Sequence, residues 1–224
     1  MCARAALTKT ASELAKLFGT KGTNLPNIRA RWNLCPTDTA PIVRDGGGGE
    51  RELVSAIWDY RDGKVATLKG RRPLINLRGE SFRGTRSFAT SRCLVPVDGF
   101  YEFRKTGAKP LPYYFTRQDG GAFALGGVWS LWQGETETLL TYAVLTVAPN
   151  HLVGAIHDRM PLVIDESNWG AWLNAPADQA AKLVATNKMD GYERRPVSTR
   201  VNSVKNDDAS LIEPVADAGT DLFG

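Results

Sequence analysis

Residues 92–103 read Arg92-Cys93-Leu94-Val95-Pro96-Val97-Asp98-Gly99-Phe100-Tyr101-Glu102-Phe103, and they decide the fold. From residue 92 onward the sequence is dominated by short runs that favour β-strands. Further strands are predicted at 113–117, 122–132 and 138–148, separated by hairpin-like turns. Strands joined in sequence by short turns pair antiparallel, so we expect an antiparallel sheet here.

Helices and shorter strands are predicted on both sides of this region. Thr10-Ala11-Ser12-Glu13 has the form of a capping box and opens a short helix that ends before Gly19. Strands are expected at 41–44, 52–58, 162–164 and 192–198, and helices at 166–173 and 175–186. We therefore predict a single α+β domain over residues 1–215, with a curved, largely antiparallel, barrel-like sheet and peripheral helices. Residues 216–224 are predicted to be a flexible tail.

Composition narrows the class of protein. The 224 residues are 42% hydrophobic and 23% charged, as in soluble globular proteins. No apolar run reaches the roughly 20 residues that span a bilayer, and no signal peptide is recognisable. Three scattered cysteines favour a reducing compartment, so we expect a cytoplasmic protein. No oligomer is implied, and we expect a monomer. Two histidines and these cysteines lack metal-ligand spacing, and we expect no metal and no cofactor.

Basic residues gather in one stretch of the chain. Between residues 69 and 92 only Glu80 opposes a set of cations: Lys69, Arg71, Arg72, Arg78, Arg83, Arg86 and Arg92. Guanidinium groups can contact phosphates with two parallel hydrogen bonds. The stretch is thus either a phosphate-binding face or a solvated loop face, and the charges alone leave both open.

Cys2 becomes chemically distinctive if Met1 is removed. It then carries a free α-amine beside its thiol, a 1,2-aminothiol that can condense with an aldehyde to an imine and close to a thiazolidine. The unperturbed amine titrates at roughly 7.7–8.0 and the thiol at about 8.5, so modest tuning leaves both reactive near neutral pH. The alternative is an ordinary residue at a frayed terminus.

Further motifs follow Cys2 in a fixed order. They are Arg4, Asn33 before Cys35-Pro36, Ile75-Asn76-Leu77-Arg78-Gly79-Glu80, the quoted residues 92–103, Ile156-His157-Asp158-Arg159-Met160-Pro161, and Asn202-Ser203-Val204-Lys205-Asn206-Asp207. Together they resemble the SOS response-associated peptidase (SRAP) family, from residue 2 to about residue 215. The resemblance implies a DNA-damage protein that senses abasic sites in single-stranded DNA and crosslinks to them through a thiazolidine. It also implies a peptidase or lyase-like enzyme activity, and a nucleoid-associated location in the cytoplasm.

The resemblance also assigns residues to roles. Cys2 is the implied nucleophile, with Asn76, Glu102 and His157 as its active-site partners. The DNA-binding residues predicted are Arg4, Asn33, Arg78, Arg86 and Arg159. For Asn33, a bond to backbone is the alternative to a bond with a ligand.

Residue chemistry agrees with these roles. Glu102 stands among aromatic residues that can raise its pKa, as a proton shuttle needs. His157 titrates near neutral pH, and the Asn76 amide can hold a sugar oxygen. Each also has a structural alternative: an ion pair for Glu102, and turn positions for His157 and Asn76.

Two other functions and two departures from the family pattern stay in view. The alternative functions are a cysteine peptidase or amidohydrolase that uses Cys2 and His157, and a non-catalytic single-stranded DNA-binding module. Ala3 and Asp59 occupy positions where the family usually has glycine, so strain at Ala3 and an altered segment after Trp58 are expected. Cys35 and Cys93 are predicted to be inert buried thiols, and the tryptophans to be core residues.

Overall fold

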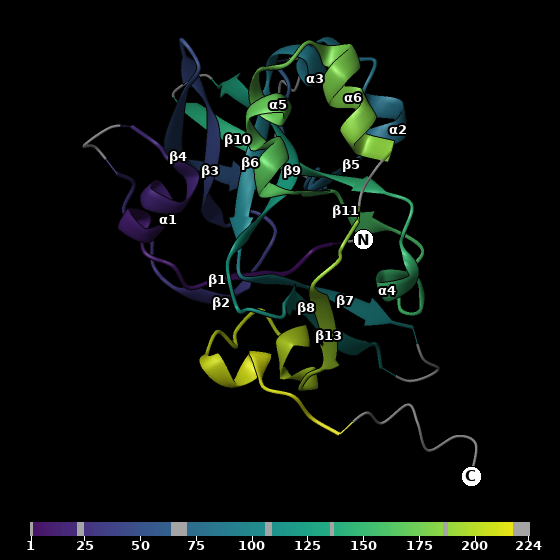
Figure 1. Ribbon diagram of the computed structural model, residues 1–224. Helices are drawn as coiled ribbons and strands as arrows, with labels where there is room; N and C mark the ends of the chain where they lie inside the picture. The colour runs from purple at the N-terminus through teal and green to yellow at the C-terminus, as the bar shows by residue number, and fades with distance from the viewer. Residues whose placement is uncertain are drawn as a thin grey trace.

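The computed structural model describes residues 2–21, 25–63, 71–105, 109–134, 137–185 and 188–216. It shows a mixed α+β domain in which two β-sheets carry short helices around them (Figure 1). The predicted α+β class, with a largely antiparallel and barrel-like sheet, is confirmed. Residues 217–224 of the predicted tail lie outside the described residues, so its boundary stays a prediction.

Five strands close into a barrel. Strand β10 pairs with β4, β4 with β3, β3 with β6, β6 with β9, and β9 again with β10. Only the β10–β4 pairing is parallel. The barrel strands are β3 (Thr39–Gly47), β4 (Glu50–Trp58), β6 (Arg92–Val97), β9 (Phe123–Gln133) and β10 (Thr138–Val147). Closure removes the free edges of the ring and gives its inward side chains one shared core.

Three short strands extend the barrel sheet. Strand β5 (Asn76–Arg78) pairs parallel with β10, β11 (Met160–Pro161) pairs antiparallel with β10, and β12 (Val163–Ile164) pairs antiparallel with β9. The parallel pairings of β10 were not predicted. They join segments far apart in the sequence, whereas the turn rule applies only to strands that follow one another.

The second sheet is antiparallel throughout, with strand order β13-β8-β7-β1-β2. Its strands are β1 (Ala5–Leu7), β2 (Arg31–Leu34), β7 (Gly99–Arg104), β8 (Leu111–Arg117) and β13 (Tyr192–Pro196). Strand β6 of the barrel ends at Val97 and β7 begins at Gly99, so residues 92–103 carry the chain from one sheet into the other.

Gly99 is required at this crossing. A Cβ atom there would lie 2.3 Å from Cζ of Tyr114 and 2.6 Å from the carbonyl oxygen of Phe115, so only glycine allows β7 to lie this close to β8. Its neighbour Asp98 accepts hydrogen bonds of 2.6 Å from both the backbone N–H and the hydroxyl of Thr8. The Asp-Gly pair thus ties the crossing to the residues just after β1.

Short helices cover the sheets. They are α1 (Ala11–Phe18), α2 (Gly79–Phe82), α3 (Arg86–Thr90), α4 (His151–Gly154), α5 (Trp169–Asn174) and α6 (Ala177–Ala185), with 3-10 turns η1 (Glu166–Asn168), η2 (Thr199–Asn202) and η3 (Ala209–Ile212). Figure 1 shows α2, α3, α5 and α6 grouped at one end of the barrel. The predicted capping box of α1 is confirmed, since Thr10 and Glu13 exchange side-chain-to-backbone hydrogen bonds and Gly19 ends the helix with φ +60°.

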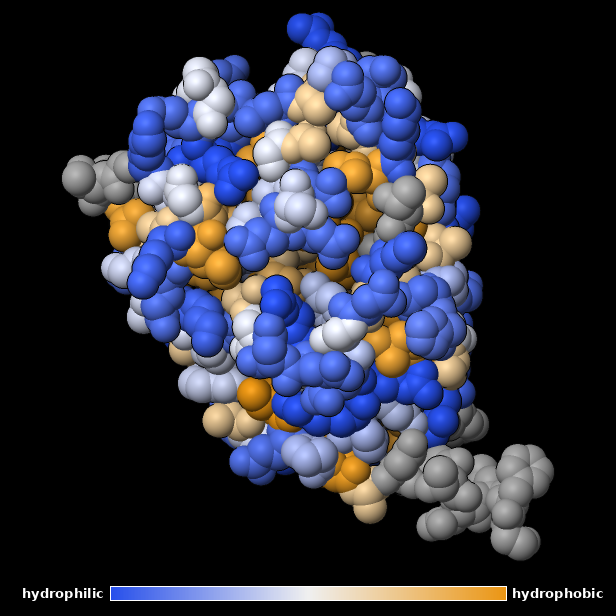
Figure 2. Space-filling model, viewed as in Figure 1, coloured by the Kyte–Doolittle hydropathy of each residue, from blue (hydrophilic) through white to orange (hydrophobic). Residues whose placement is uncertain are grey.

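Aromatic side chains fill much of the core. The buried tryptophans are Trp58, Trp132, Trp169 and Trp172, and the other two, Trp32 and Trp129, are half-buried. The prediction that they are core residues is therefore largely confirmed. Figure 2 shows a face that is mostly hydrophilic, with hydrophobic residues in small separate areas. Along the described part of the chain, the helices are too short or too polar to cross a membrane.

Candidate active site

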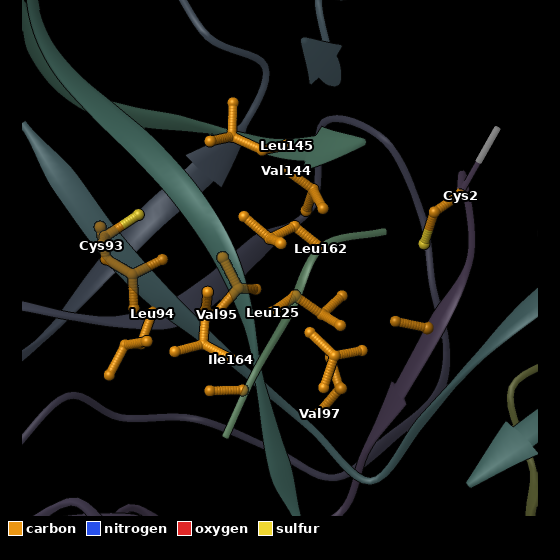
Figure 3. Close-up of a cluster of buried hydrophobic side chains, with 14 of the residues drawn as sticks. Cys2, Cys93, Leu94, Val95, Val97, Leu125, Val144, Leu145, Leu162 and Ile164 are labelled. Atoms are coloured by element: carbon orange, nitrogen blue, oxygen red, sulfur yellow. The ribbon is translucent and has the colours of Figure 1, made fainter. Parts of the chain in front are cut away.

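Cys2 lies ahead of β1, at the seam between the barrel and the second sheet. Its side chain is fully buried and lies at one edge of the main hydrophobic cluster (Figure 3). The thiol is 3.9 Å from the carbonyl oxygen of Arg4. Burial raises the pKa of the thiol, and the nearby Glu102 carboxylate raises it further. A thiol in this setting needs a proton acceptor before it can react.

The pairing of β1 with β7 brings Cys2 to Glu102. Ala5 is the partner of Phe100, and the Tyr101 N–H donates to the Arg4 carbonyl oxygen over 3.0 Å. In an antiparallel pair, the residues that precede one strand run beside those that follow in the other. The start of the chain therefore runs past Tyr101 toward Glu102. This explains why the Glu102 carboxylate raises the pKa of the Cys2 thiol.

Glu102 is a buried carboxyl group on a predominantly apolar face. Side chains alternate along β7, so Glu102 shares a face with Phe100, which belongs to the main core, while Tyr101 joins a second cluster on the opposite face. Glu102 is 0% exposed, and this burial raises its pKa to about 7. Both protonation states are therefore populated near neutral pH, as predicted for a proton shuttle.

Asn76 holds the backbone of Cys2. Strand β5 places Asn76 beside Val144 of β10, and its side-chain Nδ2 donates to the Cys2 carbonyl oxygen over 2.7 Å. A carbonyl oxygen only accepts, so the amide nitrogen must face Cys2 and Oδ1 must point away. Among the described residues, buried Oδ1 has no hydrogen-bond partner. Asn76 therefore fixes Cys2 while keeping one acceptor open.

His157 sits in the loop after α4. The carboxyl-terminal turn of α4 supports it, because the His157 N–H donates to the Val153 carbonyl over 3.0 Å. Its Nδ1 lies 3.0 Å from the Arg159 N–H and 3.0 Å from Oδ1 of exposed Asp158. Burial lowers the pKa of His157, which favours the neutral ring. Nδ1 also lies 3.1 Å from the Arg159 carbonyl oxygen. This oxygen and the Asp158 carboxylate only accept, so they favour the proton on Nδ1 and leave Nε2 of the neutral ring as an acceptor.

The four predicted catalytic residues therefore gather in one region. Cys2 is bonded to Asn76 and coupled to Glu102. The Asp158 carboxylate raises the pKa of both Glu102 and His157, which links His157 to the same neighbourhood. Residues from β5, β7 and the loop after α4 thus converge on the start of the chain.

Arg159 was predicted to contact DNA, and this stays a prediction; in the described structure its guanidinium binds groups of the protein. Its guanidinium makes two hydrogen bonds, of 2.8 and 2.7 Å, to the Glu80 carboxylate, and a third to the Thr146 carbonyl. The Arg159 side chain is only 17% exposed. The ion pair lowers the pKa of Glu80 to about 2. Arg159 therefore anchors the His157 loop to α2 instead of offering a free cation.

Asn33 requires correction as a predicted DNA-binding residue. Its side chain is 0% exposed, and its Nδ2 donates to three backbone carbonyl oxygens of the closing motif, those of Val201, Ser203 and Asn206. This is the backbone alternative left open by the sequence. Asn33 fastens the C-terminal turns onto β2 and presents no group to a ligand.

The remaining predicted cations differ in exposure. Arg78 at the end of β5 and Arg86 at the start of α3 are both exposed, and Arg4 is half-buried beside Cys2. In the same basic stretch Arg92 is buried, and its guanidinium bonds five carbonyl oxygens at the ends of α3 and α5. Lys69 lies outside the described residues. The basic stretch is thus part surface and part internal support.

Neither family departure damages the described geometry. Ala3 is not among the residues with positive φ in the described chain, so the expected strain is absent. Asp59 is 4% exposed and accepts hydrogen bonds from Arg61, Arg71 and the Leu74 N–H. The sequence reasoning missed both this role and that of Glu80. The signal was a lone acidic residue near several arginines, which does not reveal which arginine it binds.

The described residues contain no group of three or more histidine, cysteine or acidic side chains placed to hold a metal ion. Four pockets of about 250 to 440 Å³ lie elsewhere on the surface, and none of them is lined by Cys2, Asn76, Glu102 or His157.

Comparisons with known proteins agree on one family. The family model described as SOS response associated peptidase (SRAP) matches residues 1–204. The abasic site processing protein YoqW of Bacillus subtilis is 34% identical over 191 residues, which cover 81% of this chain and 85% of that protein. The abasic site processing protein YedK of Escherichia coli is 27% identical and covers 85% of this chain and 87% of its own length.

A solved structure supports the fold. A protein from Bacteroides thetaiotaomicron superposes with a TM-score of 0.84 at 18% identity, covering 96% of this chain and 100% of that one. At this identity the likeness concerns the fold alone.

Proposed function

Because the chain belongs to the SOS response associated peptidase family, we propose that it detects abasic sites in single-stranded DNA and crosslinks to them through Cys2 after removal of Met1. The observation that carries the proposal is the arrangement around Cys2. Its carbonyl is held by Asn76, and its thiol is coupled to Glu102, whose pKa of about 7 suits proton transfer at neutral pH. The named relatives act as abasic site processing proteins.

The first step opens the sugar. An abasic deoxyribose is mostly a closed hemiacetal, so its hydroxyl must lose a proton while its ring oxygen gains one. In the proposed reaction, Nε2 of the neutral His157 ring takes the hydroxyl proton while the Glu102 carboxyl group gives its proton to the ring oxygen, and the protonated imidazole then returns the proton to the Glu102 carboxylate. The open acceptor Oδ1 of Asn76 receives a hydrogen bond from a sugar hydroxyl.

The next steps join protein and DNA without a redox change. The Cys2 α-amine adds to the aldehyde carbon, and the resulting hydroxyl leaves as water after protonation by the Glu102 carboxyl group, which gives an imine. The thiol then adds to the imine carbon, and its proton passes through the Glu102 carboxylate to the nitrogen. One water is released, and one C–N and one C–S bond form. The buried, high-pKa thiol explains why a neighbouring base is needed.

Phosphate contacts are assigned to exposed arginines. Arg78 lies two residues after Asn76 on the same strand, and Arg86 begins α3 after one intervening helix. Such contacts give binding that depends on salt and little on sequence. Arg4 is placed nearer the reacting residue.

The proposal is tested with protein whose N-terminal residue has been verified as Cys2 by mass spectrometry. The protein is incubated with a single-stranded oligonucleotide carrying one abasic site and then denatured. We expect a denaturation-resistant band and a mass equal to protein plus DNA minus one water. A tetrahydrofuran analogue, which cannot open to an aldehyde, is the matched control and should give no band.

Two other outcomes would replace the proposal. Folded protein with a free Cys2 that gives no covalent product, but binds the tetrahydrofuran oligonucleotide, would be a non-catalytic DNA-binding module. Steady multiple-turnover cleavage of an amide substrate that depends on Cys2 and His157 would indicate a peptidase or amidohydrolase.

A further inference from the structure

Asp59 is the most heavily engaged buried acid outside the four proposed catalytic residues. Its side chain is 5% exposed. Oδ2 accepts from Nε of Arg61 over 3.0 Å, while Oδ1 accepts from the Arg71 guanidinium and, over 2.9 Å, from the Leu74 N–H. A buried carboxylate is tolerated when its oxygens are this fully bonded. The Asp59 side chain thus binds residues near both ends of the segment that joins β4 to β5.

The residues just before Asn76 are held by further hydrogen bonds from the end of β4 and the residues that follow it. The Tyr60 N–H donates to the Leu74 carbonyl over 2.9 Å, and the Trp58 indole Nε1 donates to the Ile75 carbonyl over 2.9 Å. Residues 74 and 75 are therefore held from the end of β4, and residue 76 follows at once. From there the Asn76 amide reaches the Cys2 carbonyl over 2.7 Å.

We propose that Asp59 is a positioning residue for Asn76, so that it aligns Cys2 for the crosslinking reaction. This inference rests on the proposed function for its kinetic consequence only. Asp59 touches neither Cys2 nor Asn76 in the described structure; it acts by fixing Leu74, two residues before Asn76.

The kinetic test separates alignment from DNA affinity. Asp59→Asn keeps the size of the side chain but removes its charge, and we expect the crosslinking rate at saturating abasic oligonucleotide to fall by about 10- to 100-fold. Affinity for the tetrahydrofuran oligonucleotide should change less than about 3-fold, because no phosphate contact is assigned to Asp59. In an Asn76→Ala background, Asp59→Asn should cause no further loss of rate. The proposal would be overturned if the two rate losses multiplied in the double variant, or if Asp59→Asn lowered only the affinity for DNA.

A second measurement does not depend on DNA chemistry. In nuclear magnetic resonance spectra of labelled protein, the side-chain amide signals of Asn76 and the hydrogen-exchange protection of the Leu74 N–H should both change in Asp59→Asn. The control Asp119→Asn removes a more exposed carboxylate that pairs with Arg117, and it should leave both signals unchanged. Unchanged Asn76 signals in folded Asp59→Asn protein would refute the positioning role even if no crosslink ever forms. A changed signal without crosslinking would refute only the proposed function.

Two more variants guard against misfolding. Arg71→Gln removes one donor to Asp59 at a side chain that is 23% exposed and should give a weaker change of the same kind. Asp59→Glu keeps the charge and should recover part of the lost rate. If Asp59→Asn does not fold, an Arg71→Gln protein with wild-type Asn76 signals and rate would count against the proposal.

Discussion

Cys2 and Cys93 are equally buried, yet their surroundings differ. Both side chains are 0% exposed, and burial raises the pKa of both thiols. Figure 3 shows them at opposite ends of one hydrophobic cluster. Cys2 has the Glu102 carboxylate and the Asn76 amide beside it, whereas Cys93 lies in strand β6 against Gly127, where an added Cβ would be 3.0 Å from its sulfur.

This difference shows that burial alone does not decide reactivity. A buried thiol is inert unless a neighbouring group can take its proton. At the seam, Glu102 has a pKa of about 7 and can do so. In the barrel wall, Arg44 is the charged group that acts on the pKa of the Cys93 thiol. Its guanidinium donates to the Glu52 carboxylate and lies over the Trp129 ring.

The largest effect is expected for Cys2→Ser. A hydroxyl cannot replace the thiol in a stable five-membered ring, so the denaturation-resistant crosslink should fall below about 0.1% of the wild-type yield. The α-amine remains, so an imine trapped by a reducing agent should still appear. Gel analysis with and without the reductant measures both. A stable crosslink in Cys2→Ser without reductant would assign the chemistry to another residue and remove the distinction between the two cysteines.

Glu102→Gln should give the next largest effect. Loss of the proton shuttle is expected to slow crosslinking by about 100-fold, and the part of the rate–pH profile that titrates near pH 7 should disappear. Quench-flow or gel time courses across pH measure both. A profile unchanged by the substitution would show that Glu102 does not serve the thiol.

The same variant has an opposite effect on stability. Because the folded pKa of about 7 lies above the ordinary glutamate pKa of 4.5, ionised Glu102 is penalised in the folded state. This penalty is absent below about pH 4.5, grows as the pH rises, and is complete above about pH 7. Glu102→Gln should therefore gain stability relative to wild type over this range, by about 3 kcal/mol at most. Denaturant unfolding at pH 4.5 and 8 measures the difference.

Much of the fold could be predicted from the sequence because its signals are local. The capping box of α1 and the hairpin strands both depend on residues a few positions apart. The parallel pairing of β10 with β4 and β5 could not, because it joins distant segments without a turn between them. Barrel closure depends on that pairing.

The residue types of the candidate site could be predicted from the sequence, but the groups that each side chain binds could not. The motifs identified Cys2, Asn76, Glu102 and His157, and the structure gathers them. They could not distinguish the free Arg78 from Arg159, because an exposed cation and one held by Glu80 look alike in a sequence. Asn33 was misassigned for the same reason: its partners are backbone carbonyls more than 160 positions away.

A smaller effect is expected for Arg78→Ala and Arg86→Ala. Arg78 ends β5 and Arg86 begins α3, and both are exposed. Each lost phosphate contact should lower the slope of log affinity against log salt by about 0.7 for single strands. Titration of a tetrahydrofuran oligonucleotide at several salt concentrations measures it. The control Arg200→Ala removes an arginine paired with Asp208 and should leave the slope unchanged; equal changes in all three would mean that only net charge matters.

The smallest effect on the reaction is expected for Cys93→Ala. The substitution removes one buried sulfur from a packed wall, so the unfolding free energy should fall by about 1 kcal/mol and the Tm by about 2–4 °C. The crosslinking rate should stay within about 2-fold of wild type, because Cys93 supplies no proton acceptor and no contact to Cys2. Calorimetry and the gel assay test the two statements on one sample. A Cys93→Ala protein of normal stability that crosslinks far more slowly would show that the barrel wall takes part in the chemistry. The groups beside each cysteine would then no longer explain why one buried cysteine is reactive and the other is structural.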